Sequence, residues 1–217
     1  MKKRLLALFL LPVLLAPLAR AVEDNDFQTW LDASVAKAIN DRWTVRLEQE
    51  LWMADDSSRT IYTHTDLGAA WKANDHLICG LYYRSVESRS GEDWKHEDRP
   101  HLDFVFKGAH AGVQAQNRAR FEYRIRNNVD EVMRFRDRVM VLYPTTLLGA
   151  KVTPYISEEA FIDTDQGDFN QFRTATGLKK KFGTSFEGDL YYLWQAVEAS
   201  TDWTDAHILG LAGSFLF

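Results

Sequence analysis

The sequence predicts an all-β fold, a single up-and-down antiparallel transmembrane β-barrel of about 10–12 strands that follows a cleaved signal peptide. Three observations lead to this prediction. The first residues have the layout of an export signal, and the chain ends in an apolar segment whose last residue is aromatic. Between them, apolar and polar residues alternate with period two over segments of about ten residues, the length that a tilted membrane strand needs.

The export signal has three parts. Met1–Arg4 is positively charged, Leu5–Leu18 is apolar, and Ala19–Ala21 has the small-residue pattern of a cleavage site. The apolar run is too short to span a membrane comfortably and ends at that site, which argues against a membrane anchor. We therefore expect the mature chain to begin at Val22. The expected domains are a signal peptide, 1–21, and an outer-membrane β-barrel domain, 22–217.

Charge and cysteine content exclude some classes of function. The signal carries four basic residues and no acidic ones, so its removal changes the formal net charge from −5 to −9. Such a chain is poorly suited to binding nucleic acid, which needs a basic face. The single cysteine, Cys79, allows no intramolecular disulfide.

The clearest strand runs from Trp43 to Met53. One face is almost entirely apolar, whereas the other carries Arg46, Glu48 and Glu50. This alternation fits a soluble sandwich as well as a membrane barrel, so segment length and spacing decide for the barrel. The expected strands are 27–38, 43–53, 61–71, 77–87, 101–107, 113–126, 132–142, 152–162, 170–180, 185–195 and 207–217.

The connections between these strands alternate in length. Two of the short turns share Asn-Asp chemistry, because the segment 37–43 is echoed by 72–77. Short turns on one rim and long polar loops on the other are typical of outer-membrane barrels. Short turns are expected at 40–41, 74–75, 108–112 and 181–184, and longer charged loops at 55–60, 88–100, 163–169 and 196–205.

The number of strands raises a difficulty. The segments number eleven, whereas single-chain bacterial barrels have even numbers of strands. With the C-terminus in the periplasm, eleven strands would place the N-terminus outside the cell. Either one segment is miscounted, or the first strand is not an ordinary stave of the barrel.

The C-terminal segment is the most specific signal for a barrel. Leu209, Leu211, Gly213, Phe215 and Phe217 share one face, and Phe217 is the last residue. This pattern resembles the terminal strand that the barrel-assembly machinery recognises. We therefore expect Phe215 and Phe217 to form an assembly signal, with that machinery as a partner during biogenesis and outer-membrane lipid as the surroundings of the finished protein.

Five segments of the mature chain resemble a known family. They are 97–103 (EDRPHLD), 117–124 (NRARFEYR), 134–138 (RFRDR), 154–161 (PYISEEAF) and 170–177 (NQFRTATG). In this order they resemble the domain-of-unknown-function family 2490, a set of predicted bacterial outer-membrane barrels. The resemblance implies the fold and the location, and it implies no activity.

Arginines gather on one face of two neighbouring strands. The first strand carries Arg118, Arg120, Glu122, Arg124 and Arg126 on that face, and the second carries three more arginines. An arginine that faces lipid at mid-membrane costs about 2–4 kcal/mol, so these side chains must point into the barrel. A hairpin about 127–131 would bring together three cross-strand pairs: Glu122 and Arg136, Arg120 and Arg138, and Arg124 and Arg134.

So many cations need acidic partners from other strands, because like charges opposite each other destabilise a strand pair. Candidate acids are Glu48, Glu50, Glu159, Glu187 and Asp189, and further cations are Arg46, Arg84 and Arg173. Two interpretations follow. We favour a packed ionic interior, structural or binding a small ligand, because a narrow barrel leaves little free space. The alternative is a narrow channel or transporter that prefers anions, with a small anionic solute as its cargo.

Enzymatic and metal sites are not expected, and neither is a cofactor. A lipid hydrolase needs a serine activated by a histidine, and the best candidates, Ser200 and His207, form no recognisable motif. His96, Glu97, Asp98 and His101 cluster in an expected solvated loop without a metal-binding motif. A lipid hydrolase of the outer membrane remains the least favoured alternative, and the sequence gives no oligomeric state.

Overall fold

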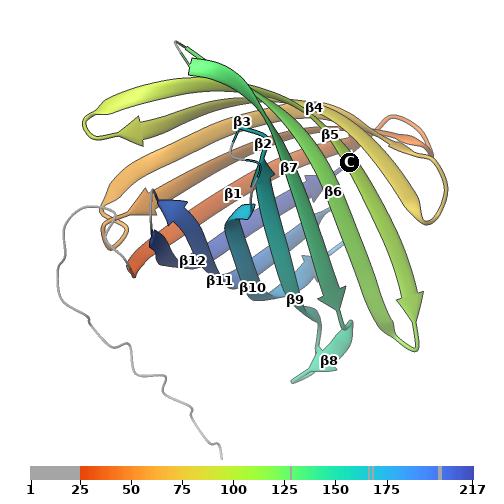
Figure 1. Cartoon of the computed structure of the whole chain (residues 1–217). Coiled ribbons are helices and arrows are strands. Elements are labelled where there is room, and N and C mark those ends of the chain that lie inside the picture. Colours follow the sequence, from red (N-terminus) through yellow and green to blue (C-terminus); the bar gives the residue numbers. More distant parts are fainter. Residues whose placement is uncertain (1–24, 128, 166, 168, 200–201) are drawn as a thin grey trace, which may run out of the picture.

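The protein is an all-β barrel (Figure 1). The computed structural model describes residues 25–127, 129–165, 167, 169–199 and 202–217. The predicted signal peptide, 1–21, and the predicted mature terminus at Val22 lie outside these residues. No helix in the described part of the chain is long and apolar enough to cross a membrane. The strands are β1 (Asp26–Ala38), β2 (Trp43–Ala54), β3 (Arg59–Lys72), β4 (Leu77–Ser90), β5 (Asp93–His110), β6 (Val113–Arg126), β7 (Val129–Leu142), β8 (Thr145–Leu147), β9 (Ala150–Asp163), β10 (Phe169–Phe182), β11 (Phe186–Ala199) and β12 (Asp202–Leu216).

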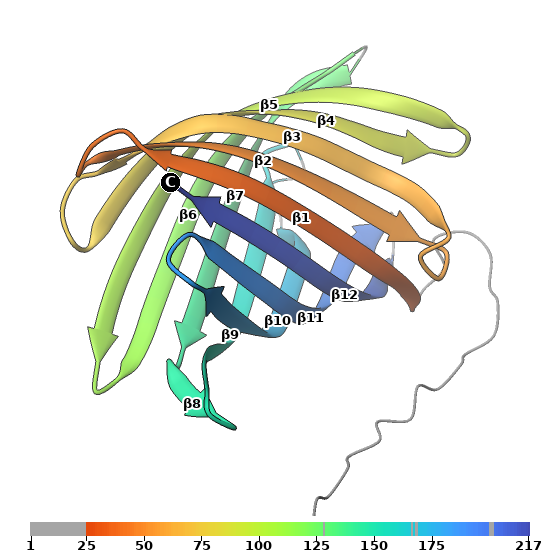
Figure 2. The same ribbon diagram turned by 180° about the vertical axis from the view of Figure 1, so that it is seen from behind.

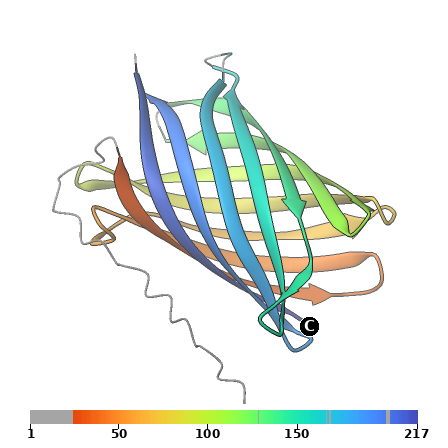
Figure 3. The same ribbon diagram turned by 90° about the horizontal axis from the view of Figure 1, so that it is seen from below.

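Eleven of these strands close into one ring. Each strand pairs with the next along the chain, except that β7 pairs with β9, and β12 returns to pair with β1. The short β8 pairs only with β9, in the connection between β7 and β9, and projects beyond the ring (Figures 1 and 3). The predicted barrel is confirmed, and the eleven expected segments are its eleven staves.

The first strand accounts for the odd number. Strands that alternate in direction around a ring must be even in number, so a ring of eleven contains one parallel pair. That pair is β1 and β12, aligned from Asp26 beside Ala206 to Ala36 beside Leu216. Figure 2 shows the two strands side by side and pointing the same way. Of the two alternatives that the odd count left open, the second therefore holds: the first strand is no ordinary stave.

The barrel has two rims. The turn rim holds the end of β12 and the β1–β2, β3–β4, β5–β6, β7–β9 and β10–β11 connections, and the loop rim holds the start of β1 and the other connections. Asn40 and Asn74 shape two turns identically. The Oδ1 of Asn40 accepts hydrogen bonds from the backbone N–H groups of Arg42 and Trp43, and the Oδ1 of Asn74 accepts them from His76 and Leu77. The predicted reuse of Asn-Asp turn chemistry is confirmed.

Two of the predicted long loops are wrong. The segment 88–100 is mostly strand, because β4 continues to Ser90 and β5 begins at Asp93. Likewise β11 continues to Ala199 and β12 begins at Asp202, inside the expected loop 196–205. Charged residues made these segments look solvated, although half of the side chains in an alternating strand point into the polar interior. The two rims therefore differ less than expected.

Burial is inverted relative to a soluble domain. Large apolar residues are exposed on every outward face, for example Leu67, Leu81 and Leu190, whereas Asp66, Arg120 and Glu122 are at most 1% exposed. An apolar exterior around a polar interior is the arrangement of membrane barrels. An apolar cluster inside the barrel, formed by Trp30, Leu193, Ile208 and two alanines, lines the side made by β10–β12 and β1.

Candidate functional site

The charged residues predicted to face inward gather around one cavity of about 530 Å³ in the barrel interior. Period-two alternation directs them there, since each lies on the inward face of its strand. Glu122 and Arg126 are not among the lining residues, and Glu122 is fully buried behind them. The lining residues from this predicted set are Arg46, Glu48, Glu50, Arg84, Arg118, Arg120, Arg124, Arg134, Arg136, Arg138, Glu159, Arg173, Glu187 and Asp189.

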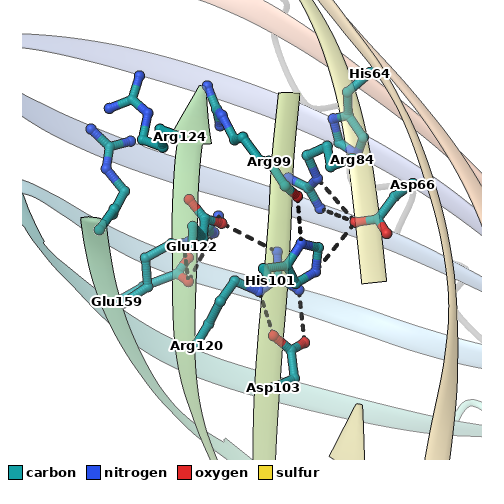
Figure 4. A network of polar contacts seen from close by, with 12 residues as sticks. His64, Asp66, Arg84, Arg99, His101, Asp103, Arg120, Glu122, Arg124 and Glu159 are labelled. Carbon is teal, nitrogen blue, oxygen red and sulfur yellow. Dashed lines mark hydrogen bonds and ion pairs between the residues drawn. The ribbon is translucent and has the colours of Figure 1, made fainter. Parts of the chain in front are cut away.

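Arg120 and Glu122 form a fully buried part of the ionic network (Figure 4). Both oxygens of Asp103 accept hydrogen bonds from Arg120, at 2.6 and 2.8 Å. Arg120 also lies 3.5 Å from Glu122, whose carboxylate accepts a hydrogen bond of 2.8 Å from Arg136. Charges of opposite sign thus alternate from β5 through β6 to β7, and both Arg120 and Arg136 have carboxylate partners.

The pairing of β6 with β7 differs from the predicted register. Glu122 lies opposite Arg134, and Arg120 lies opposite Arg136, two residues away from the expected pairing. An irregularity between Arg124 and Arg126 and the early start of β7 at Val129 account for the shift. Glu122 still reaches Arg136, because these long side chains also meet diagonally across the strand pair.

Glu97 belongs to the network, and its predicted place in a solvated loop is wrong. It is 5% exposed, and its carboxylate accepts hydrogen bonds from Arg99 and Arg124, each at 2.6 Å. On the opposite face of β5, His96 points outward, 2.8 Å from Glu87 and 3.1 Å from Asp98. The histidines and acids of 96–101 are thus divided between the two faces of β5.

A second part of the network surrounds His64 and Arg84. Arg84 donates two hydrogen bonds to Asp66, at 2.7 and 2.9 Å, and lies 3.6 Å from Glu48. The imidazole of His64 lies between Glu48, at 3.2 Å, and Glu50, at 3.3 Å. Glu48, His64 and Asp66 are close enough together to hold a metal ion. The guanidinium of Arg84 already supplies a positive charge to two of these three groups.

Several direct partners were absent from the predicted set. Asp66, Asp103 and Asp163 are the carboxylates that bond to Arg84, Arg120 and Arg134. Asp66 and Asp103 lie on inward faces of segments whose alternation was already visible, and Asp163 extends the face of Glu159, so the period-two signal could have found them. Two predicted acids, Glu187 and Asp189, lie 3.9 and 3.1 Å from Lys179 instead of contacting the arginine cluster.

The region around Glu159 has more cations than acids. Arg118 and Arg136 both donate to the Oε1 of Glu159, at 2.6 and 2.9 Å. Arg138 on β7 and Arg173 on β10 are the cross-strand neighbours of Glu159 on either side. In the described part of the chain, neither has a carboxylate within 4.0 Å.

The cavity extends along most of the barrel. Ser88 and Val197, near the loop rim, line it, and so do Glu187 and Ser214, near the turn rim. Its volume lies in the range of small-molecule sites, about 300–1,000 Å³. The interior is therefore packed tightly on the side of the buried network and hollow beside it.

His207, the histidine considered for a hydrolase, lies on the outward face of β12, and its Nδ1 is 2.6 Å from the hydroxyl of Tyr192. Ser200, its proposed partner, lies outside the described residues.

Comparison with known proteins identifies a family and nothing further. A search of curated proteins gave no match, and neither did a search of solved structures. The family profile described as "Protein of unknown function (DUF2490)" matches residues 27–206. This match runs from the second residue of β1 into β12 and includes every strand of the ionic network. The resemblance seen in the sequence is confirmed, and the chain belongs to the DUF2490 family.

Proposed function

We propose that the chain is a non-enzymatic protein of the outer membrane of a Gram-negative bacterium, exported by a signal peptide, whose interior admits small anionic solutes. The apolar exterior supports the location. Aromatic residues near both rims support it too, because membrane barrels carry aromatic girdles at both interfaces. Trp43 and Trp71 are exposed at the turn rim, and Trp94 and Trp203 at the loop rim.

The charge of the cavity lining supports a preference for anions. Among the described residues that line the cavity, eleven are arginine or lysine and seven are aspartate or glutamate. Asp66, Asp103, Glu122 and Asp163 are buried and are not among the lining residues. An entering solute therefore meets more positive than negative groups, and a lining of one predominant sign concentrates ions of the opposite sign.

A purely structural barrel is the second candidate. The network through Asp103, Arg120, Glu122 and Arg136 is almost completely buried and fills one side of the interior. Ion networks of this kind can fix a fold without any ligand. The hollow side of the barrel favours the first proposal over this one.

The location predicts how the C-terminus behaves. The side chain of Phe217 is 66% exposed, whereas its backbone bonds to Ala36 and Ala38 of β1. Phe217→Ala keeps those backbone bonds and should lower the amount of barrel recovered in the outer-membrane fraction. The thermal stability of the inserted barrel should change little. Cell fractionation and heat-modifiable gel migration test this, and recovery of the wild-type chain as a soluble periplasmic protein would contradict the location.

The proposed preference for anions predicts ionic current. Reconstituted into planar bilayers under a potassium chloride gradient, the barrel should show a small conductance whose reversal potential lies toward that of chloride. The reason is that the lining carries the larger number of cations. A cation-selective current would contradict the proposal, and a barrel that carries no current would favour the structural candidate.

A further inference from the structure

Arg138 and Arg173 differ from the other arginines of the interior network. Both line the cavity. Both are also cross-strand neighbours of Glu159 on β9, Arg138 from β7 and Arg173 from β10. Neighbouring strands lie about 4.8 Å apart, so the two backbones are about 10 Å apart across β9. Arginine side chains are long enough for their guanidinium groups to approach each other over that distance, in the part of the cavity next to Glu159.

Glu159 does not balance these two cations. Its Oε1 already accepts hydrogen bonds from Arg118 and Arg136. The Nε of Arg138 is buried and has no hydrogen-bond partner in the described part of the structure. The Nε of Arg173 donates to a neutral group, the side-chain oxygen of Gln195, at 2.8 Å.

A surplus of arginine differs from a surplus of carboxylate. A crowded carboxylate can take up a proton, whereas arginine stays protonated in proteins. Arg138 and Arg173 therefore keep their positive charges. Both side chains are partly buried, and a partly buried cation without a carboxylate partner is costly, so this position favours an anion from outside the chain.

An aromatic wall adjoins the same position. The guanidinium carbon of Arg173 lies 4.8 Å from the ring centre of Trp30, 5.3 Å from that of Trp52 and 4.9 Å from that of Phe161. The Trp30 and Trp52 rings stack at 3.9 Å, and all three aromatic residues line the cavity. Leu193 adds to the apolar surface there.

We infer that this position binds a small organic monocarboxylate, with its carboxylate on Arg138 and Arg173 and its apolar part against Trp30 and Trp52. The inference rests on the proposed function and names the class of solute. The planar guanidinium matches the two oxygens of a carboxylate. Because the negative charge of Glu159 lies beside the position, a monoanion fits it better than a dianion such as phosphate.

Benzoate is a suitable probe, and benzamide is its neutral counterpart of nearly the same shape. Isothermal titration of the detergent-folded full-length barrel should show one benzoate site. Benzamide should bind at least about tenfold more weakly, because a bond to a charged group contributes about that much or more. This comparison needs no variant, so it does not depend on whether a variant folds.

Three variants test the assigned residues. Arg138→Gln and Arg173→Gln should each weaken benzoate binding by about ten- to a hundredfold and leave benzamide binding unchanged. Arg59→Gln is the matched control, because Arg59 lies at the loop rim, where it pairs with Asp55 and Glu92, and does not line the cavity.

Three results would overturn the inference. These are equal binding of benzoate and benzamide, tighter binding of inorganic phosphate than of benzoate, and unchanged benzoate binding in both glutamine variants. An anion-selective current in bilayers without benzoate binding would overturn the inference alone. Absence of both the current and the binding would overturn the proposed function together with it.

Discussion

Glu122→Gln is expected to destabilise the barrel by about 3 kcal/mol, the lower end of the usual cost of breaking a buried ion pair. Glu122 has no exposed surface and lies between Arg120 and Arg136. Glutamine keeps the shape and removes the charge, so two buried cations lose a shared counter-charge. The loss should stay near the lower end because Arg120 keeps Asp103 and Arg136 keeps Glu159.

The urea midpoint of the folded barrel in detergent measures this effect. Glu131→Gln is the matched control, since Glu131 lies near the start of β7, where its side chain is exposed. Substitution at such a surface position should change stability little. Glu97 was expected to lie in solvent, but its carboxylate accepts hydrogen bonds from Arg99 and Arg124. Glu97→Gln should therefore lower the urea midpoint, as Glu122→Gln does. If Glu122→Gln and Glu131→Gln unfold at the same urea concentration, the central place of Glu122 in the network is wrong.

Alternation along the chain predicted most of the fold, because a strand of a barrel with an apolar exterior and a polar interior must change side-chain character at every second residue. All eleven staves were expected, from the first at Asp26 to the last, which ends at Leu216. Their ends were less predictable. The charged residues between Ser88 and Pro100 resemble a solvated loop, although two of them, Glu97 and Arg99, lie buried on the inward face of β5 and bond to each other.

Partners within the site were harder to predict than its residues. Inward-facing arginines follow from the cost of exposing them to lipid, so Arg118, Arg120 and Arg136 were identifiable. Which carboxylate each arginine meets depends on the register, and the early start of β7 together with an irregularity near Arg124 places that register two residues from the expected one. The surplus around Glu159 also depends on β7 and β10 both neighbouring β9, which alternation does not encode.

The packing of aromatic rings onto glycines of neighbouring strands could not be predicted from the sequence either. A side-chain atom placed on Gly177 would meet the ring of Tyr155 at 2.6 Å, and one on Gly210 would collide with the ring of Tyr191. In each case an aromatic side chain lies flat over a glycine of the neighbouring strand. A glycine inside an alternating segment indicates that another group approaches the backbone closely there, but the sequence does not identify that group.

Gly68→Ala is expected to show the largest effect of this packing. A Cβ on Gly68 would lie 2.6 Å from the Cα of Tyr82 and would also collide with the carbonyl oxygen of Leu81. Both of these atoms belong to the backbone of β4, the strand paired with β3 at this point. Rotation of a side chain therefore does not relieve the clash. The two strands must separate, and such overpacking costs about 1–3 kcal/mol.

Gly108→Ala is the control, and its effect should have the opposite sign. Gly108 also lies within a strand, β5, but a Cβ there would meet no atom within 4 Å. Alanine then only restricts the unfolded chain, which stabilises the folded state by about 0.4–1 kcal/mol. Urea midpoints of the two variants should therefore move in opposite directions from that of the wild type. Equal midpoints would show that β3 and β4 separate at Gly68 without cost, and that this glycine does not hold the two strands at their close approach.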